Sequence, residues 1–104
     1  MSRIELFKQI LTSDPSNTTV LFGLANEYLK AENYAEAIPA LENYLNQAND
    51  EGAAYGMLAK AYEKQGDREK AKIAYQNGVK AATRHGHPSM AADFEETLEF
   101  DYAD

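Results

Sequence analysis

The chain has 104 residues, of which 44% are apolar and 26% are charged, a composition typical of one globular domain. It contains no cysteine, which excludes disulfides, zinc–thiolate sites and thiol catalysis. Its net charge of −7 argues against nucleic acids and anionic membrane surfaces as partners, because both are bound by clustered Lys and Arg. No apolar run reaches the length of a membrane span, and the amphipathic start of the chain does not read as a secretory leader, so we expect a cytoplasmic protein.

The acidity is concentrated at one end. Residues 1–92 carry ten Lys and Arg against eleven Asp and Glu, whereas the last twelve residues carry six acids and no base. The main body is therefore nearly neutral, and the excess negative charge belongs to the C-terminal segment.

Apolar residues recur along the chain at helical spacing, which predicts an all-α fold. The first amphipathic segment holds Ile4, Phe7, Ile10 and Leu11. Gly, Asn and Asp between the later segments supply turn and capping residues, among them Asn33 before Glu36 and the pair Gly66–Asp67. We predict six helices, near residues 3–12, 18–31, 35–48, 52–65, 68–84 and 89–100.

The four central helices are related by an internal repeat. Placing residues 18–51 over residues 52–85 needs no gap and aligns eight identical pairs: Leu24/Leu58, Ala25/Ala59, Tyr28/Tyr62, Lys30/Lys64, Ala37/Ala71, Ala40/Ala74, Asn43/Asn77 and Ala48/Ala82. The retained positions lie on one face of each helix, and the small alanines allow two helices to approach closely. The outward faces vary freely, which predicts two stacked helical hairpins.

This pattern resembles the tetratricopeptide repeat family, whose repeating unit has the same period and begins with W-x2-L-G-x2-Y. The units here read L-x2-L-A-x2-Y from Leu21 and Y-x2-L-A-x2-Y from Tyr55, with Ala37 and Ala71 at the small position of the second helix. Both units depart from the family in having Ala in place of Gly and in lacking the closing Pro. The resemblance implies one domain over residues 1–104 that contains two full repeats, residues 18–51 and 52–85.

The flanking segments read as parts of further repeats. Residues 1–15 align with the second helix of a repeat whose first helix is missing. Arg3 occupies the position of Ala37 and Ala71. At the other end, residues 88–104 read as a capping helix with an acidic tail. Its Ala91, Phe94 and Leu98 repeat the spacing of a first helix if two residues are inserted in the preceding loop.

Catalytic chemistry is not indicated. His85 and His87 flank a glycine in a loop without a third ligand at metal-binding spacing, so a polar turn is favoured over a metal or hydrolytic site. No glycine-rich phosphate loop is present. We therefore expect a protein that is not an enzyme and that needs no cofactor or metal.

The remaining candidate site is a partner-binding groove. In tetratricopeptide proteins the first helix of each unit lines a groove for an extended peptide or a helix, and the matching residues here are Thr19, Phe22, Asn26, Lys30, Ala53, Gly56, Lys60 and Lys64. This surface is either an ordinary solvated face or a groove for another protein or peptide. The hypothesis of a groove predicts an acidic segment bound along the three lysines, with Phe22 as an exposed apolar anchor.

Two further interpretations stay open. Leu6, Phe7 and Ile10 lack a preceding helix, which allows a homodimer through the end helices. The acidic tail either folds back toward the lysines and occupies the groove or remains the solvated end of the capping helix.

Overall fold

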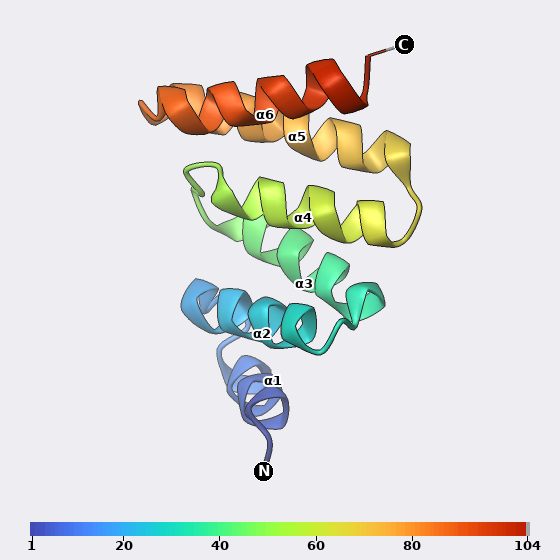
Figure 1. The fold of residues 1–104 in the computed structure, drawn as a ribbon. Coiled ribbons are helices and arrows are strands. Elements are labelled where there is room, and N and C mark those ends of the chain that lie inside the picture. The colour runs from blue at the N-terminus through green and yellow to red at the C-terminus, as the bar shows by residue number, and fades with distance from the viewer. Residues whose placement is uncertain (104) are drawn as a thin grey trace. The chain divides into compact units, whose positions relative to one another are not determined.

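The computed structural model describes residues 1–103, and within them it contains six α-helices and no strand. In chain order these are α1 (Arg3–Ser13), α2 (Thr18–Lys30), α3 (Tyr34–Gln47), α4 (Ala53–Lys64), α5 (Arg68–Arg84) and α6 (Pro88–Asp101) (Figure 1). The all-α architecture predicted from the sequence is confirmed, and every predicted end lies within one residue of the observed one. Among the described helices, none is both long enough and apolar enough to cross a bilayer.

The contacts divide the chain into two compact units. The first comprises Met1–Ala48 and holds α1, α2 and α3, while the second begins at Asn49 and holds α4, α5 and α6. The division falls close to the junction that the repeat predicts between residues 51 and 52. Each unit therefore contains one helical hairpin and one flanking helix.

Side-chain caps fix where the helices begin. The side-chain oxygen of Asn33 accepts a hydrogen bond of 3.4 Å from the Glu36 N–H, and that of Asp67 accepts one of 3.2 Å from the Lys70 N–H. Asp50 caps α4 differently, because its Oδ2 accepts from the N–H of Gly52, just before the helix, and from that of Ala54 in the first turn. These bonds satisfy backbone donors that have no partner inside the helix, and they confirm the caps predicted at Asn33 and Asp67.

The turns inside the two hairpins have the same backbone shape. Gly66 follows α4 with φ of +77°, and Glu32 occupies the equivalent position after α2 with φ of +56°. This left-handed conformation suits glycine and is strained for a residue with a side chain. The first hairpin therefore makes the same turn at a higher conformational cost.

In the first unit, α1 packs against the α2–α3 hairpin. Leu24, Tyr28 and Ala37 form the buried cluster, and five partly buried side chains pack against it: Ile4, Phe7, Leu11, Leu29 and Ala40. A Cβ built on Gly23 would lie 3.0 Å from the Phe7 ring, so this glycine makes room for the aromatic side chain. Of the three residues named for a homodimer, Phe7 already packs inside the first unit, which removes it from a surface for a second copy.

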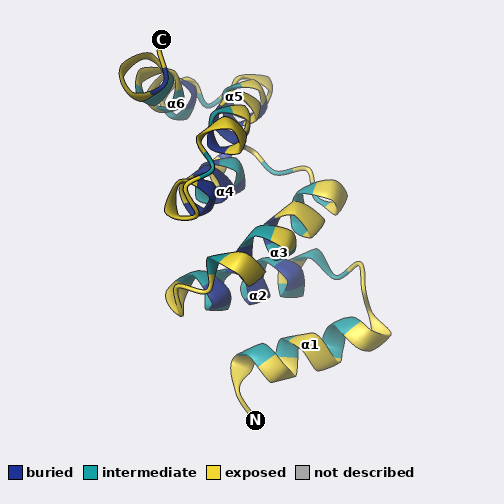
Figure 2. Ribbon diagram, turned by 90° about the vertical axis from the view of Figure 1, so that its right-hand side faces the viewer, coloured by how far each residue is buried: buried dark blue, intermediate teal, exposed yellow. Residues whose placement is uncertain are grey.

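The second unit is held together by a larger set of buried side chains. Its core consists of Ala54, Leu58, Ala59, Ala61, Tyr62, Ala71, Ala74, Tyr75, Ala81, Ala82, Ala91 and Tyr102. By contrast, α1 of the first unit contains no fully buried residue, and Figure 2 shows that helix in teal and yellow only.

Phe94 joins α6 to both helices of the second hairpin. Its ring lies against Gly56 on α4 and Gly78 on α5, and a Cβ built on either glycine would come within 2.9 Å of it. The ring centroid also lies 5.9 Å from that of Tyr75. The Phe94 ring packs directly on the backbone of these two glycines, and the Cβ of any other residue would occupy the space of the ring.

Candidate partner-binding faces

The predicted groove residues of the first unit lie along α2. Thr19 and Lys30 are exposed, whereas Phe22 and Asn26 are half-buried. The Phe22 ring is tilted against Tyr44 with a centroid separation of 5.0 Å, at the edge of a hollow of about 240 Å³. Thr18 and Thr19 complete the lining of this hollow. Phe22 is thus half-buried and in contact with Tyr44, so the expectation of a fully exposed aromatic is wrong.

Lys30 already has an ionic partner. Its Nζ lies 3.3 Å from Glu27 Oε2, and the same carboxylate oxygen lies 3.6 Å from Arg3 Nε. The charge of Lys30 is therefore offset by Glu27. Lys30 is thus less able than expected to attract an acidic partner together with Lys60 and Lys64.

The predicted residues of the second unit lie along α4 and behave differently from one another. Ala53, Lys60 and Lys64 are exposed, and the two lysines stand one helical turn apart. Within residues 1–103, neither ammonium group has a carboxylate close enough for an ion pair. Gly56 is buried under Phe94, so the expectation that it faces a partner directly is wrong.

The two histidines belong to a contact between loops of the second unit. His85 Nε2 lies 3.2 Å from Asn49 Oδ1, and His87 Nε2 contacts the Glu51 carboxylate. The hydrogen bond from His87 and its charge lower the pKa of Glu51 below its ordinary value. No cluster of three potential metal ligands occurs in the part of the chain that the structure describes.

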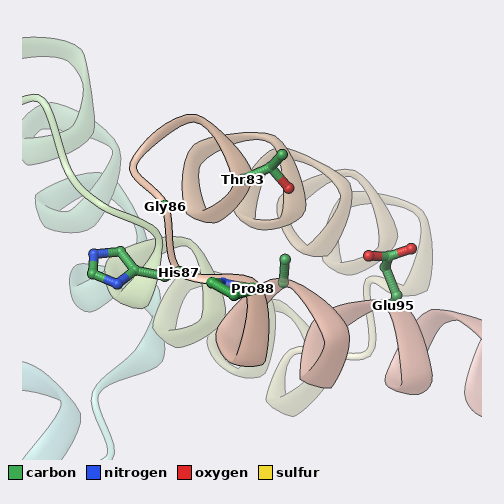
Figure 3. Close-up of a pocket in the computed structure, with 6 residues that line it drawn as sticks. Thr83, Gly86, His87, Pro88 and Glu95 are labelled. Carbon is green, nitrogen blue, oxygen red and sulfur yellow. The ribbon is translucent and has the colours of Figure 1, made fainter.

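A separate hollow of about 290 Å³ lies beside the start of α6. It is lined by Thr83, Gly86, His87, Pro88, Ala91 and Glu95. In Figure 3 the His87 ring points away from Glu95 and Thr83, which contribute a carboxylate and a hydroxyl to the lining of this hollow.

Tyr102, which follows α6, packs against the α4–α5 hairpin of the second unit. Its hydroxyl donates a hydrogen bond of 2.7 Å to Glu63 Oε2, and the Arg68 guanidinium lies 4.4 Å from its ring centroid. Arg68 also donates to the Asp101 carbonyl, and Tyr75 packs on the Tyr102 ring at 5.8 Å. Tyr102 is thus held by Glu63, Arg68 and Tyr75 rather than by the lysines of α4.

Reasoning from the sequence missed this cluster. Glu63 and Tyr102 are 39 residues apart, and the repeat offers no second copy of the pair. The available signal was Tyr102 near the end of the acidic tail, together with Arg68 in the first turn of α5.

Comparison with known proteins agrees with the arrangement of the helices. Residues 28–87 match the family model described as tetratricopeptide repeat. The TPR repeat-containing protein PA0015 of Pseudomonas aeruginosa is 30% identical over 83 residues, which cover 80% of this chain and 79% of that protein. The solution structure of protein BPP2914 from Bordetella parapertussis superposes with a TM-score of 0.76 at 25% identity, covering 95% of this chain and 86% of the other. The internal repeat, the paired helices and these matches show that the chain belongs to the tetratricopeptide repeat family.

Proposed function

We propose that this protein binds a carboxylate-bearing segment of another protein through the outward face of α4. Proteins built from tetratricopeptide repeats generally act as scaffolds that hold other proteins, which supports a binding role over a catalytic one. The proposal adds the chemistry of the partner and the residues that recognise it.

The observation that carries the proposal is the pair Lys60 and Lys64. Both side chains extend from the first helix of the second hairpin, both are exposed, and no carboxylate among residues 1–103 pairs with either. Two such ammonium groups one turn apart attract a segment with acids at matching spacing. Because both lie in water, the attraction weakens as the salt concentration rises.

The first unit supplies groups of another kind. The hollow beside Phe22 and Tyr44 offers aromatic surface to an apolar side chain, and the nearby Asn26 amide offers a donor and an acceptor to a peptide backbone. Lys30 contributes less, since Glu27 already offsets its charge. The recognition of acidic residues in the ligand therefore rests on Lys60 and Lys64 of α4.

Binding to synthetic peptides tests this proposal. The probe is a fluorescein-labelled peptide that contains several glutamates and one phenylalanine, and its matched control has glutamine at every glutamate. Fluorescence polarisation compares the wild type with the variant Lys60→Glu/Lys64→Glu. The protein control is Lys80→Glu/Arg84→Glu, which makes the same change of charge at the same spacing on exposed positions of α5.

We expect the acidic peptide to bind the wild type more tightly than the amide peptide does. The Lys60→Glu/Lys64→Glu variant should lose at least roughly tenfold in affinity, because like charges then face each other, while the α5 control stays within about twofold. If both variants lost the same amount of affinity, the loss would be due to the net charge of the protein. That result would contradict binding at the α4 face.

A further inference from the structure

The helices α1 and α6 occupy complementary positions of one repeat. The spacing from Arg3 to Ala37 equals that from Ala37 to Ala71, so α1 has the register of a second helix. The spacing from Ala59 to Glu95 exceeds one repeat by the two residues inserted in the loop before α6. The register of α6 is that of a first helix, which places Glu95 where the two full repeats have Ala25 and Ala59.

In the full repeats these positions lie between the two helices of a hairpin. Ala25 and Ala37 are completely buried in the α2–α3 hairpin, and Ala59 and Ala71 are completely buried in the α4–α5 hairpin. The equivalents Arg3 and Glu95 are long, oppositely charged and exposed. The intact repeats have alanine at both of these positions. The corresponding residues are a cation on α1 and an anion on α6.

The neighbours of Arg3 and Glu95 continue two uncovered faces. On α1, Arg3, Leu6 and Ile10 follow each other at spacings of three and four, and Leu6 remains 45% exposed although it is apolar. On α6, the exposed Glu95 and the half-buried Leu98 form the corresponding row, beside the hollow shown in Figure 3, while Ala91 one turn earlier is buried in the core of the second unit. Each row therefore combines exposed or half-buried apolar side chains with one charged side chain.

The surrounding charges are complementary as well. The sequence of α6 contains five Asp and Glu residues and no Lys or Arg, whereas α1 contains Arg3 and Lys8 against Glu5. Arg3 now contacts Glu27, but that carboxylate is also paired with Lys30, so it keeps a partner when Arg3 moves away. Glu95 has no ion-pair partner among the described residues.

We propose that the uncovered face of α6 binds α1 of a second copy of this chain. The two helices then pack as a hairpin across the copies, with Arg3 of one copy beside Glu95 of the next and Leu6 and Ile10 packing against Leu98. The contact joins two different surfaces, so every copy offers both halves of it. This inference is independent of the proposed peptide binding, because it uses neither Lys60 nor Lys64.

Sedimentation velocity over a series of protein concentrations tests the inference. The two single variants are Arg3→Glu and Glu95→Arg, each of which places like charges at the contact. The matched control is Asp93→Arg, which makes the same change of charge on α6 about 200° around the helix from Glu95. Circular dichroism establishes that every variant keeps its helices.

The wild type and Asp93→Arg should sediment as larger species as the concentration rises. Each single variant alone should associate roughly tenfold or more weakly, because like charges oppose each other at the contact. An equal mixture of the two variants should recover association, since every contact between unlike copies again joins opposite charges. A wild type that stays monomeric throughout the series, or a mixture that associates no better than its components, would overturn the inference.

Discussion

Tyr102 and Glu63 are joined by a hydrogen bond of 2.7 Å between the tyrosine hydroxyl and the carboxylate, across 39 residues of sequence. The other oxygen of the same carboxylate accepts a bond of 3.2 Å from the Tyr75 hydroxyl. Two tyrosines thus share one acceptor, and the end of α6 is fixed to the end of α4. This cluster holds the end of the acidic C-terminal helix against the second hairpin.

Removing the Tyr102 hydroxyl should destabilise the protein moderately. The variant Tyr102→Phe loses a hydrogen bond to a charged acceptor but keeps the ring between Arg68 and Tyr75, so we expect a loss of about 1–2 kcal/mol in the free energy of unfolding. Tyr102→Ala also loses the buried ring and should cost roughly 3 kcal/mol or more. Urea denaturation followed by circular dichroism measures both, and equal losses in the two variants would contradict the role given to the ring.

The same bond makes stability depend on pH in the alkaline range. Burial, followed by the hydrogen bond and the charge of Glu63, raises the pKa of Tyr102 to about 12 from its ordinary value of 10.0. The contribution of Tyr102 to stability is therefore fully present below pH 10 and is lost as the pH rises from 10 toward 12. Absorbance titration of phenolate should show one late-titrating group fewer in Tyr102→Phe than in the wild type. An unchanged titration curve above pH 11 would contradict the raised pKa.

The two hairpin turns should respond in opposite directions to glycine. Glu32 has a φ of +56°, so Glu32→Gly should relieve strain and stabilise the protein by about 1 kcal/mol. Gly66→Ala should destabilise it by a similar amount, since φ is +77° there. The control is Ala31→Gly, at a φ of −81°, where glycine should bring no gain. Thermal unfolding measures all three, and a Glu32→Gly variant no more stable than Ala31→Gly would show that the turn is unstrained.

Mutations of Gly56 and Phe94 should be energetically coupled, because the two residues are in contact. Gly56→Ala places a Cβ within 2.9 Å of the ring and should cost about 1–3 kcal/mol. Phe94→Leu removes part of the ring and should make the same alanine less costly, so the double variant should be more stable than the sum of the single effects predicts. Simple additivity in a double-mutant cycle would contradict the contact.

Local chemistry explains why so much of the fold is predictable from the sequence. Asn33 and Asp67 cap helices through bonds to residues three positions away, and the repeated alanines and tyrosines recur at a fixed period. The contacts that were missed join distant residues without a repeat to indicate them, as with Phe94 on Gly56 and Tyr102 on Glu63. The ion pair that occupies Lys30 depends on side-chain geometry, which periodicity does not specify.

The measurement that tests the central claim most directly is a nuclear magnetic resonance titration of the isotope-labelled protein with the glutamate-containing peptide. The account predicts that shifts of backbone amides concentrate along α4 around Lys60 and Lys64. Shifts that concentrate instead on the exposed side of α5 around Lys80 and Arg84, or an absence of shifts at saturating peptide, would contradict it.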